Sequence, residues 1–205
     1  MSIMKFYYKK MEFEVPESVY EPREDSMLLA KTLERLKLKG AAALEIGCGS
    51  GFLSVLLAKK KADVTAVDIN PEAVETTKLN AKASKTHVNA FQSDLFSSVE
   101  GRFDLIVFNP PYLPAEERDV TYSGGKSGRD TIEKFIVQAK KYLNPGGGVM
   151  IVISSLTGEK EVIELFKEQG MKATVIDKEK VPWEELIVLG ANLEHGQALQ
   201  GVRQK

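Results

Sequence analysis

The chain has 205 residues and a formal net charge of −1, with 43% hydrophobic and 28% charged residues. This balance is typical of a soluble globular protein, and the length fits one domain with a substantial core. There is no apolar run long enough to cross a membrane and no signal-peptide pattern, so we expect a cytoplasmic protein. The near-neutral charge argues against a protein that grips long nucleic acid unaided. Because Cys48 is the only cysteine, an internal disulfide is excluded and we expect no metal site.

The first part of the chain predicts an arm followed by a helix. Residues 4–14 alternate aromatic and charged side chains, which is typical of one or two short strands or an arm. Asp25 or a neighbour can cap the helix that follows, and this helix is predicted to end at Leu38 to Gly40. Leucines at helical spacing mark its apolar face: Leu28, Leu29, Leu33 and Leu36.

The rest of the chain alternates strand and helix patterns, which predicts a doubly wound α/β fold. The predicted strands are 41–46, 64–67, 87–91, 105–108, 148–153, 171–181 and 186–191. Amphipathic helices are predicted over 131–143 and 159–169. A polar loop over 115–129 is long enough to suggest a lid or a substrate-binding loop. We predict a single domain over 1–193 and a disordered polar tail over 194–205.

A glycine-rich turn, Glu45 to Gly51, connects the first of these strands to a helix. Glycines at alternate positions permit a tight turn and close approach of a ligand to the backbone. Their spacing is not Gly-x-Gly-x-x-Gly, so the nicotinamide-dinucleotide fingerprint is not met. The acidic Glu45 would repel a pyrophosphate. It suits a ligand with a cationic amino acid portion, such as S-adenosylmethionine.

Two more carboxylates follow predicted strands. Asp68 lies about 20 residues past the glycine turn, where a carboxylate can accept both ribose hydroxyls. It could also cap the helix opened by Asn70. Asp94 could accept from an adenine amino group while Leu95 packs on the ring, although Asp94 could equally be an ordinary solvated loop residue.

The stretch Phe103 to Pro114 contains the most distinctive motif. Its apolar run Leu105–Phe108 is typical of a strand buried on both faces of a parallel sheet. The run stops at Asn109-Pro110-Pro111-Tyr112. A residue before proline is held extended, and proline has no N–H, so the chain forms a stiff corner. Open α/β sheets bind their ligands at such strand ends.

This corner suits chemistry on a planar nitrogen, which is a poor nucleophile because its lone pair is conjugated. The Asn109 side-chain oxygen and the Pro110 carbonyl can both accept its N–H hydrogens. Holding them pulls the nitrogen toward tetrahedral geometry and aims its lone pair. Tyr112 offers a flat face for stacking. Taken alone, the motif could be only a strong turn after a strand.

Together these motifs resemble the HemK-type glutamine methyltransferases over about residues 15–193. Within them, the chain is similar to the archaeal and eukaryotic branch that modifies peptide chain release factors. The resemblance implies the class I methyltransferase fold, a doubly wound, mostly parallel seven-stranded sheet with an antiparallel last strand. It is carried by Tyr20 to Ser26, Glu45 to Gly51, Asp68, Asp94-Leu95, Asn109 to Tyr112 and the Gly124-Gly125/Gly128-Arg129 loop.

The resemblance also implies roles for individual residues. The implied contacts to the cofactor S-adenosylmethionine come from Ser26, Glu45, Gly47, Asp68, Asp94, Leu95 and Asn109. Ser26 stands where threonine is expected, and it still offers a hydroxyl. The substrate amide is expected against Asn109, Pro110, Pro111, Tyr112 and Leu113, with Asn109, Pro110 and Tyr112 as catalytic residues. The implied substrate is the glutamine of a release factor's Gly-Gly-Gln loop, methylated on its side-chain nitrogen.

The resemblance further implies a small zinc-binding activator protein as a partner. In this fold the third strand, near His87 to Phe91, lies at one edge of the sheet. It carries no lysine, glutamate or proline to blunt that edge. A partner could add a strand there and cover Val88 and Phe91, or a loop or the N-terminal arm could cover it instead.

Other functions remain open from the sequence. The same corner could methylate an amino nitrogen of a nucleic-acid base (adenine, cytosine or guanine), although a base methylase needs a basic face or an added recognition domain. A sensor that only binds the cofactor fits less well because the reactive corner is complete. Lysine methylation fits poorly because an ammonium needs a deprotonating environment.

Overall fold

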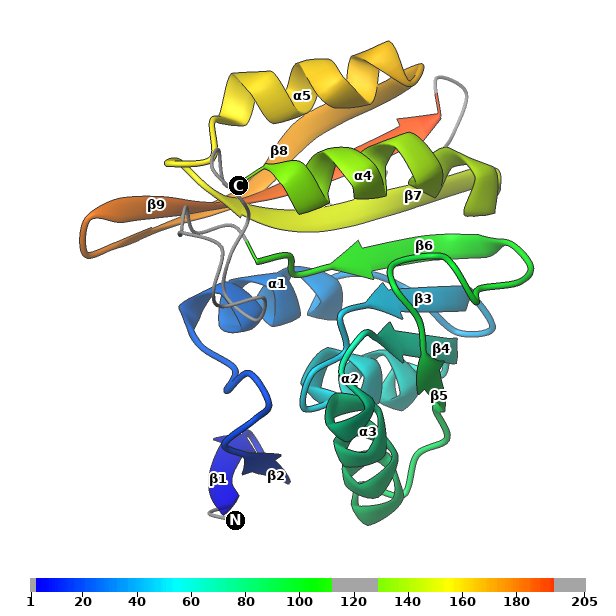
Figure 1. Ribbon diagram of the computed structural model, residues 1–205, viewed down its shortest axis with the longest axis vertical. Helices are drawn as coiled ribbons and strands as arrows, with labels where there is room; N and C mark the ends of the chain where they lie inside the picture. The colour runs from blue at the N-terminus through cyan, green and yellow to red at the C-terminus, as the bar shows by residue number, and fades with distance from the viewer. Residues whose placement is uncertain (1–2, 112–128, 194–205) are drawn as a thin grey trace.

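The computed structural model describes residues 3–111 and 129–193. Its strands form a two-stranded sheet and a seven-stranded sheet, the latter with helices on both faces (Figure 1). In chain order the elements are β1 (Ile3–Tyr8), β2 (Met11–Pro16), α1 (Glu24–Glu34), β3 (Ala42–Ile46), α2 (Phe52–Lys59), β4 (Asp63–Asp68), α3 (Pro71–Ala83), β5 (Asn89–Gln92), β6 (Phe103–Phe108), α4 (Asp130–Ala139), the 3₁₀ turn η1 (Lys140–Tyr142), β7 (Leu143–Ser154), α5 (Glu159–Glu168), β8 (Met171–Val181) and β9 (Glu184–Leu193).

The large sheet has the strand order β5-β4-β3-β6-β7-β9-β8. Strands β3 to β7 pair in parallel, and β9 is antiparallel to both of its neighbours. The predicted fold class is therefore confirmed. From β3 the chain builds outward to β5 and then returns to β6 on the other side of β3. This reversal is a topological switch point, the place where doubly wound sheets bind ligands.

The central strand β6 explains why its sequence is a continuous apolar run. Leu105 and Val107 face the layer that holds α1 and α2, whereas Ile106 and Phe108 face the layer of α4 and α5. Figure 1 shows these two helix layers on opposite sides of the sheet. Alternate side chains therefore enter two separate cores, and neither set meets water.

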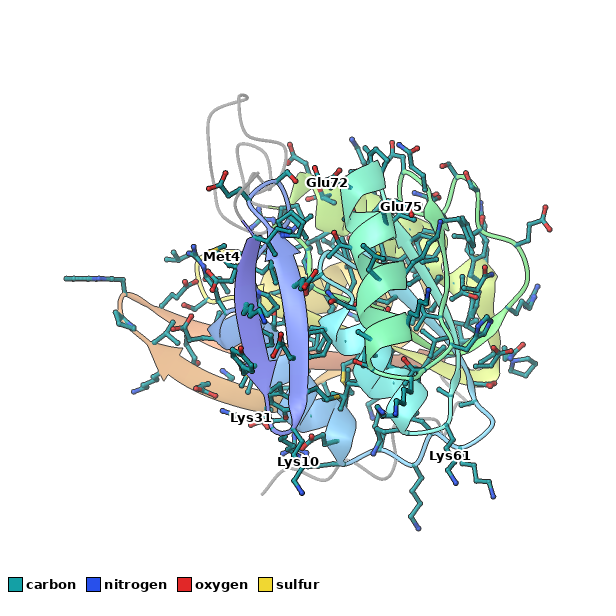
Figure 2. All side chains as sticks on the ribbon, turned by 90° about the horizontal axis from the view of Figure 1, so that it is seen from below. Met4, Lys10, Lys31, Lys61, Glu72 and Glu75 are labelled. Carbon is teal, nitrogen blue, oxygen red and sulfur yellow. The ribbon has the colours of Figure 1, made fainter. Side chains whose placement is uncertain are left out.

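The N-terminal arm is an antiparallel hairpin that packs against helices. The ring of Phe52 in α2 contacts Phe6, Tyr8 and Phe13 at centroid distances of 5.0, 4.9 and 5.5 Å. The Asn80 side chain of α3 accepts from the Glu14 N–H at 3.0 Å and donates to its carbonyl at 2.8 Å. Figure 2 shows the hairpin beside α3, and its two strands form a sheet separate from the one that contains β5.

Several predicted boundaries differ from the structure. Helix α1 ends at Glu34, well before Gly40, and its N-cap residue Arg23 makes no side-chain capping bond. The predicted capping role of Asp25 is therefore wrong, because Asp25 lies inside the first turn. Strand β5 begins at Asn89, two residues later than predicted. Strand β7 begins earlier than predicted, because Leu143 pairs with Phe103 before the turn that precedes Gly148.

The described residues include no helix that is long and apolar enough to span a membrane. The predicted loop over 115–129, apart from Arg129, and the predicted tail over 194–205 lie outside the described residues. The single domain over 1–193 stays a prediction.

Candidate active site

A cavity of about 500 Å³ opens at the carboxyl ends of the central strands. Its lining brings together nine of the predicted site residues: Ser26, Glu45, Gly47, Asp68, Asp94, Leu95, Asn109, Pro110 and Pro111. Tyr112 and Leu113 lie outside the described residues. The nine come from five separate segments, which only the doubly wound topology gathers at one edge.

The glycine turn is shaped by close packing as well as by its conformation. Gly51 has φ +75°, and a Cβ there would lie 2.8 Å from the Thr77 Cα, so a side chain would push α3 away from the turn. Gly47 has φ +67° and lines the cavity against the ring of Phe108. Both positions favour glycine, which leaves the backbone of the turn open to a ligand.

Glu45 lies in the cavity wall at the end of β3 and is almost fully buried. Its Oε2 accepts a hydrogen bond from the Ser54 hydroxyl of α2. Burial, together with the nearby Asp68 carboxylate, raises the pKa of Glu45 to about 8, although the Ser54 hydrogen bond opposes the rise. A cation placed beside Glu45 would offset the cost of burying its charged form, so this wall is suited to a positively charged group.

Asp68 ends β4 and holds the turns on either side of it. Its Oδ2 accepts from the Gly49 N–H and its Oδ1 from the Asn70 N–H, each at 2.9 Å. Burial raises the pKa of Asp68, and these N–H groups oppose the rise. Asn70, not Asp68, is the N-cap of α3, because the Asn70 side chain accepts from the Glu72 N–H at 3.0 Å. The alternative role of Asp68 as a cap is therefore wrong.

Asp94 and Leu95 follow β5 at the far wall of the cavity. Leu95 has φ +47°, a left-handed conformation that costs about 1 kcal/mol or more for such a residue. The Ser93 hydroxyl donates to the Leu95 carbonyl at 2.9 Å and helps to hold it. Ile69, which follows Asp68, also lines the cavity with 54% of its surface exposed. Ile69 was not predicted as a site residue, although an apolar residue directly after a strand-end carboxylate is a usable signal.

Asn109 is fixed at the end of β6 by a residue 83 positions earlier in the chain. Its Nδ2 donates to the Ser26 hydroxyl of α1 at 3.1 Å. Its Oδ1 is buried and has no hydrogen-bond partner among the described residues. Buried acceptors without a partner are uncommon because they are costly. This oxygen is therefore a candidate acceptor for a ligand N–H.

Five more residues of the N-terminal segment line the cavity but were not predicted as site residues, and two of them, Tyr20 and Asp25, are hydrogen-bonded to each other. The Tyr20 hydroxyl donates to Asp25 Oδ2 at 2.8 Å, and Asp25 is only 4% exposed. The sequence signal for Asp25 was an acidic residue at a helix start, which is more often a cap than a site residue.

The described lining contains four carboxylates (Asp25, Glu45, Asp68 and Asp94) and no lysine, arginine or histidine. Such a wall repels phosphates and attracts a cationic ligand. Its neutral part, Asn109 with Pro110 and Pro111, is suited to a planar group that donates hydrogen bonds. These two halves fit the class of protein that brings a cationic cofactor to a planar nitrogen.

The comparisons with known proteins agree with this class. The family model of the methyltransferase small domain matches residues 21–180. A provisionally named protein N5-glutamine methyltransferase of Methanocaldococcus jannaschii is 48% identical, covering 84% of this chain and 91% of its own. Methyltransferase HEMK2 of Homo sapiens is 32% identical, covering 83% and 88%. The chain therefore belongs to the methyltransferase small domain family, in the group of the protein N5-glutamine methyltransferases.

Solved structures give the same fold. The Mtq2–Trm112 complex of E. cuniculi, described as responsible for methylation of the termination factor eRF1, matches with a TM-score of 0.72 and 27% identity over 85% of this chain and 98% of that chain. The 16S rRNA guanine methyltransferase RsmC of T. thermophilus, solved with AdoMet and guanosine, matches with a TM-score of 0.73 and 25% identity over 93% of this chain and 50% of that chain.

Proposed function

We propose that this chain methylates the side-chain amide nitrogen of the glutamine in the Gly-Gly-Gln loop of a peptide chain release factor, with S-adenosylmethionine as methyl donor. The observation that carries the proposal is the buried Oδ1 of Asn109, which has no partner among the described residues and lies at the edge of an acidic cavity. The names of the relatives and of the Mtq2–Trm112 neighbour support the substrate.

The acidic half of the cavity fits the cofactor. When bound, S-adenosylmethionine supplies a methyl group on a positively charged sulfur that is already activated for transfer. Glu45 would attract its cationic amino acid portion beside Gly47. Asp68 has lone pairs left for the ribose hydroxyls after accepting its two backbone N–H groups. Asp94 would accept from the adenine amino group, with Leu95 against the ring.

The neutral half of the cavity fits the substrate amide. Asn109 Oδ1 would accept one N–H of the glutamine side chain and the Pro110 carbonyl the other, with Pro111, Tyr112 and Leu113 beside them. Two acceptors hold the nitrogen so that its lone pair points along the line of transfer. The described lining contains no lysine or histidine to act as a strong base. None is needed, because the proton can leave for solvent once the N–C bond has formed.

Methylation of a nucleic-acid base is the second candidate function, and the RsmC neighbour favours it. This chain, however, spans only 50% of that neighbour, whereas it spans 91% of the glutamine methyltransferase relative. With a net charge of −1, the chain has no net electrostatic attraction to the RNA phosphates.

We also propose that a small zinc-binding activator protein docks at the free edge of β5. Within the described chain β5 pairs only with β4, so one side of its backbone is available for strand addition. The Mtq2–Trm112 neighbour is a complex of this general kind. Val88 is already buried in the core and lies outside β5, so it belongs to the fold rather than to the docking surface. Hydrogen exchange tests the site: amides 89–92 should gain protection when the partner is added, and unchanged exchange there contradicts it.

A direct test of the substrate is to incubate the protein and S-adenosylmethionine with three probes. These are a peptide containing Gly-Gly-Gln, the same peptide with asparagine in place of glutamine, and a single-stranded oligonucleotide. Tandem mass spectrometry should locate one added methyl group on the glutamine side chain alone. Methylation of the oligonucleotide without the peptide would support the second candidate function instead.

A further inference from the structure

Asp25 is connected to Asn109 by a chain of hydrogen bonds through Ser26. We propose that Asp25 is a positioning residue that decides which end of the Asn109 amide faces the substrate. The inference rests on the proposed function, because it concerns how the substrate amide is recognised. Asp25 does not touch the substrate nitrogen in this account and acts only through Ser26.

The direction of the chain follows from proton counting. The Ser26 hydroxyl has one proton, and it donates this proton to Asp25 Oδ1 at 3.1 Å. Toward Asn109 the hydroxyl can then act only as an acceptor. Asn109 therefore turns its NH₂ group to Ser26, with Nδ2 to Oγ at 3.1 Å, and presents Oδ1 on the other side.

Asp25 is well suited to fix this direction because a carboxylate only accepts hydrogen bonds. Its Oδ1 also accepts from the Ser26 N–H, and its Oδ2 accepts from the Tyr20 hydroxyl at 2.8 Å. The side chain is 4% exposed, so water competes little for these bonds. In the opposite arrangement, with the Ser26 proton on Asn109 Oδ1, Asp25 Oδ1 would lose the hydrogen bond from the Ser26 hydroxyl.

The consequence is a choice between two chemically similar substrates. With Oδ1 presented, the site accepts the NH₂ group of a glutamine side chain. A glutamate side chain offers only acceptor oxygens, which would face the Asn109 oxygen without a proton between them. Sites built around a hydrogen bond strongly reject analogues that cannot form that bond. Asp25 therefore contributes to the preference for glutamine over glutamate.

The experiment compares two peptides on three variants. The peptides contain Gly-Gly-Gln and Gly-Gly-Glu, the first assayed as substrate and the second as competitive inhibitor. Asp25→Ala removes the acceptor and frees the Ser26 proton. Asp25→Asn keeps an oxygen that can accept from Ser26. Glu24→Gln is the matched control, because Glu24 is an exposed acidic residue of the same helix turn.

The preference for the glutamine peptide is the inhibition constant of the glutamate peptide divided by the KM of the glutamine peptide. We expect this ratio to fall at least about tenfold in Asp25→Ala and to stay near wild type in Asp25→Asn and Glu24→Gln. The ratio does not depend on how much of a variant is folded. A purely structural role would weaken both peptides equally, so an unchanged ratio in Asp25→Ala overturns the inference. An equally large fall of this ratio in Asp25→Asn also overturns the inference, because that variant keeps an oxygen that can accept the Ser26 proton.

A second readout needs no substrate. The side-chain ¹⁵N–¹H₂ resonances of Asn109 should shift in Asp25→Ala and remain in place in Glu24→Gln. Unmoved resonances in Asp25→Ala contradict the inference. Failure of the wild type to methylate the glutamine peptide would instead contradict the proposed function, and the resonances would still report on Asp25.

Discussion

At the scale of single residues, the cavity is built from carboxylates that are costly to bury. Glu45 and Asp68 both have raised pKa values because burial removes them from water. A folded protein keeps such groups where a ligand or a backbone contact compensates for them. Asp68 has its backbone contacts, whereas Glu45 has Ser54 and the space of the cavity beside it.

Asp68→Ala should weaken S-adenosylmethionine binding at least about tenfold. Hydrogen bonds to charged groups contribute about 1.5–3 kcal/mol each, and the variant would lose those that we propose Asp68 forms with the ribose. Titration calorimetry measures the affinity, and circular dichroism checks that the variant is folded. Asp63→Ala is the control, because Asp63 is an exposed residue at the start of the same strand. Unchanged affinity in folded Asp68→Ala would remove Asp68 from the cofactor site.

Glu45 should make the ligand-free protein less stable as the pH rises. Its pKa of about 8 in the folded state exceeds its ordinary value near 4.5, so the folded state holds the proton more tightly. The stabilising contribution is present in full below about pH 4.5 and is lost as the pH rises through about 8. Between about pH 5 and about pH 9, the wild type should lose at least about 1 kcal/mol more unfolding free energy than Glu45→Gln. Parallel urea-unfolding profiles would show that Glu45 titrates normally.

At the scale of elements, the β8–β9 hairpin carries an unusual turn. Val181 pairs with Glu184, which leaves Pro182 and Trp183 as a two-residue turn. Trp183 has φ +74° and is 97% exposed. Proline followed by a positive φ is the pattern of a type II turn, whose second position favours glycine. The tryptophan therefore adds backbone strain and buries almost nothing.

Trp183→Gly should raise the free energy of unfolding by about 1 kcal/mol, because glycine adopts a positive φ without strain. Trp183→Ala is the matched control. It removes the same ring but keeps a Cβ, so it should show a smaller gain. Chemical denaturation of the three proteins measures the difference. A loss of stability in Trp183→Gly would mean that the ring makes a stabilising contact.

The elements themselves could be predicted from local patterns, and their ends less well. The run from Leu105 to Phe108 predicted a central strand because both of its faces enter a core. Strand β7 was predicted too short, because its first residue pairs with β6 ahead of a turn whose sequence normally ends a strand. Helix α1 was predicted too long, because leucines beyond its end still pack into the core.

At the scale of the whole molecule, the switch point between β3 and β6 explains the location of the site. Motifs after four strands could be identified in the sequence because each has its own local chemistry. The hydrogen bonds between Asp25, Ser26 and Asn109 could not, because their direction depends on residues 83 positions apart that meet only in the fold. The boundary at residue 193 remains a proposal.

In the proposed mechanism, Asn109 Oδ1 activates the nitrogen of the substrate glutamine. The most direct measurement is single-turnover methyl transfer to the Gly-Gly-Gln glutamine of an intact release factor, read by mass spectrometry, for the wild type and Asn109→Ala. We expect transfer by the wild type, and a rate at least about a hundredfold lower in a folded variant that still binds the cofactor, because a transition-state hydrogen bond is lost. A rate within a few-fold of the wild type, or a methyl group found away from that glutamine, would contradict it.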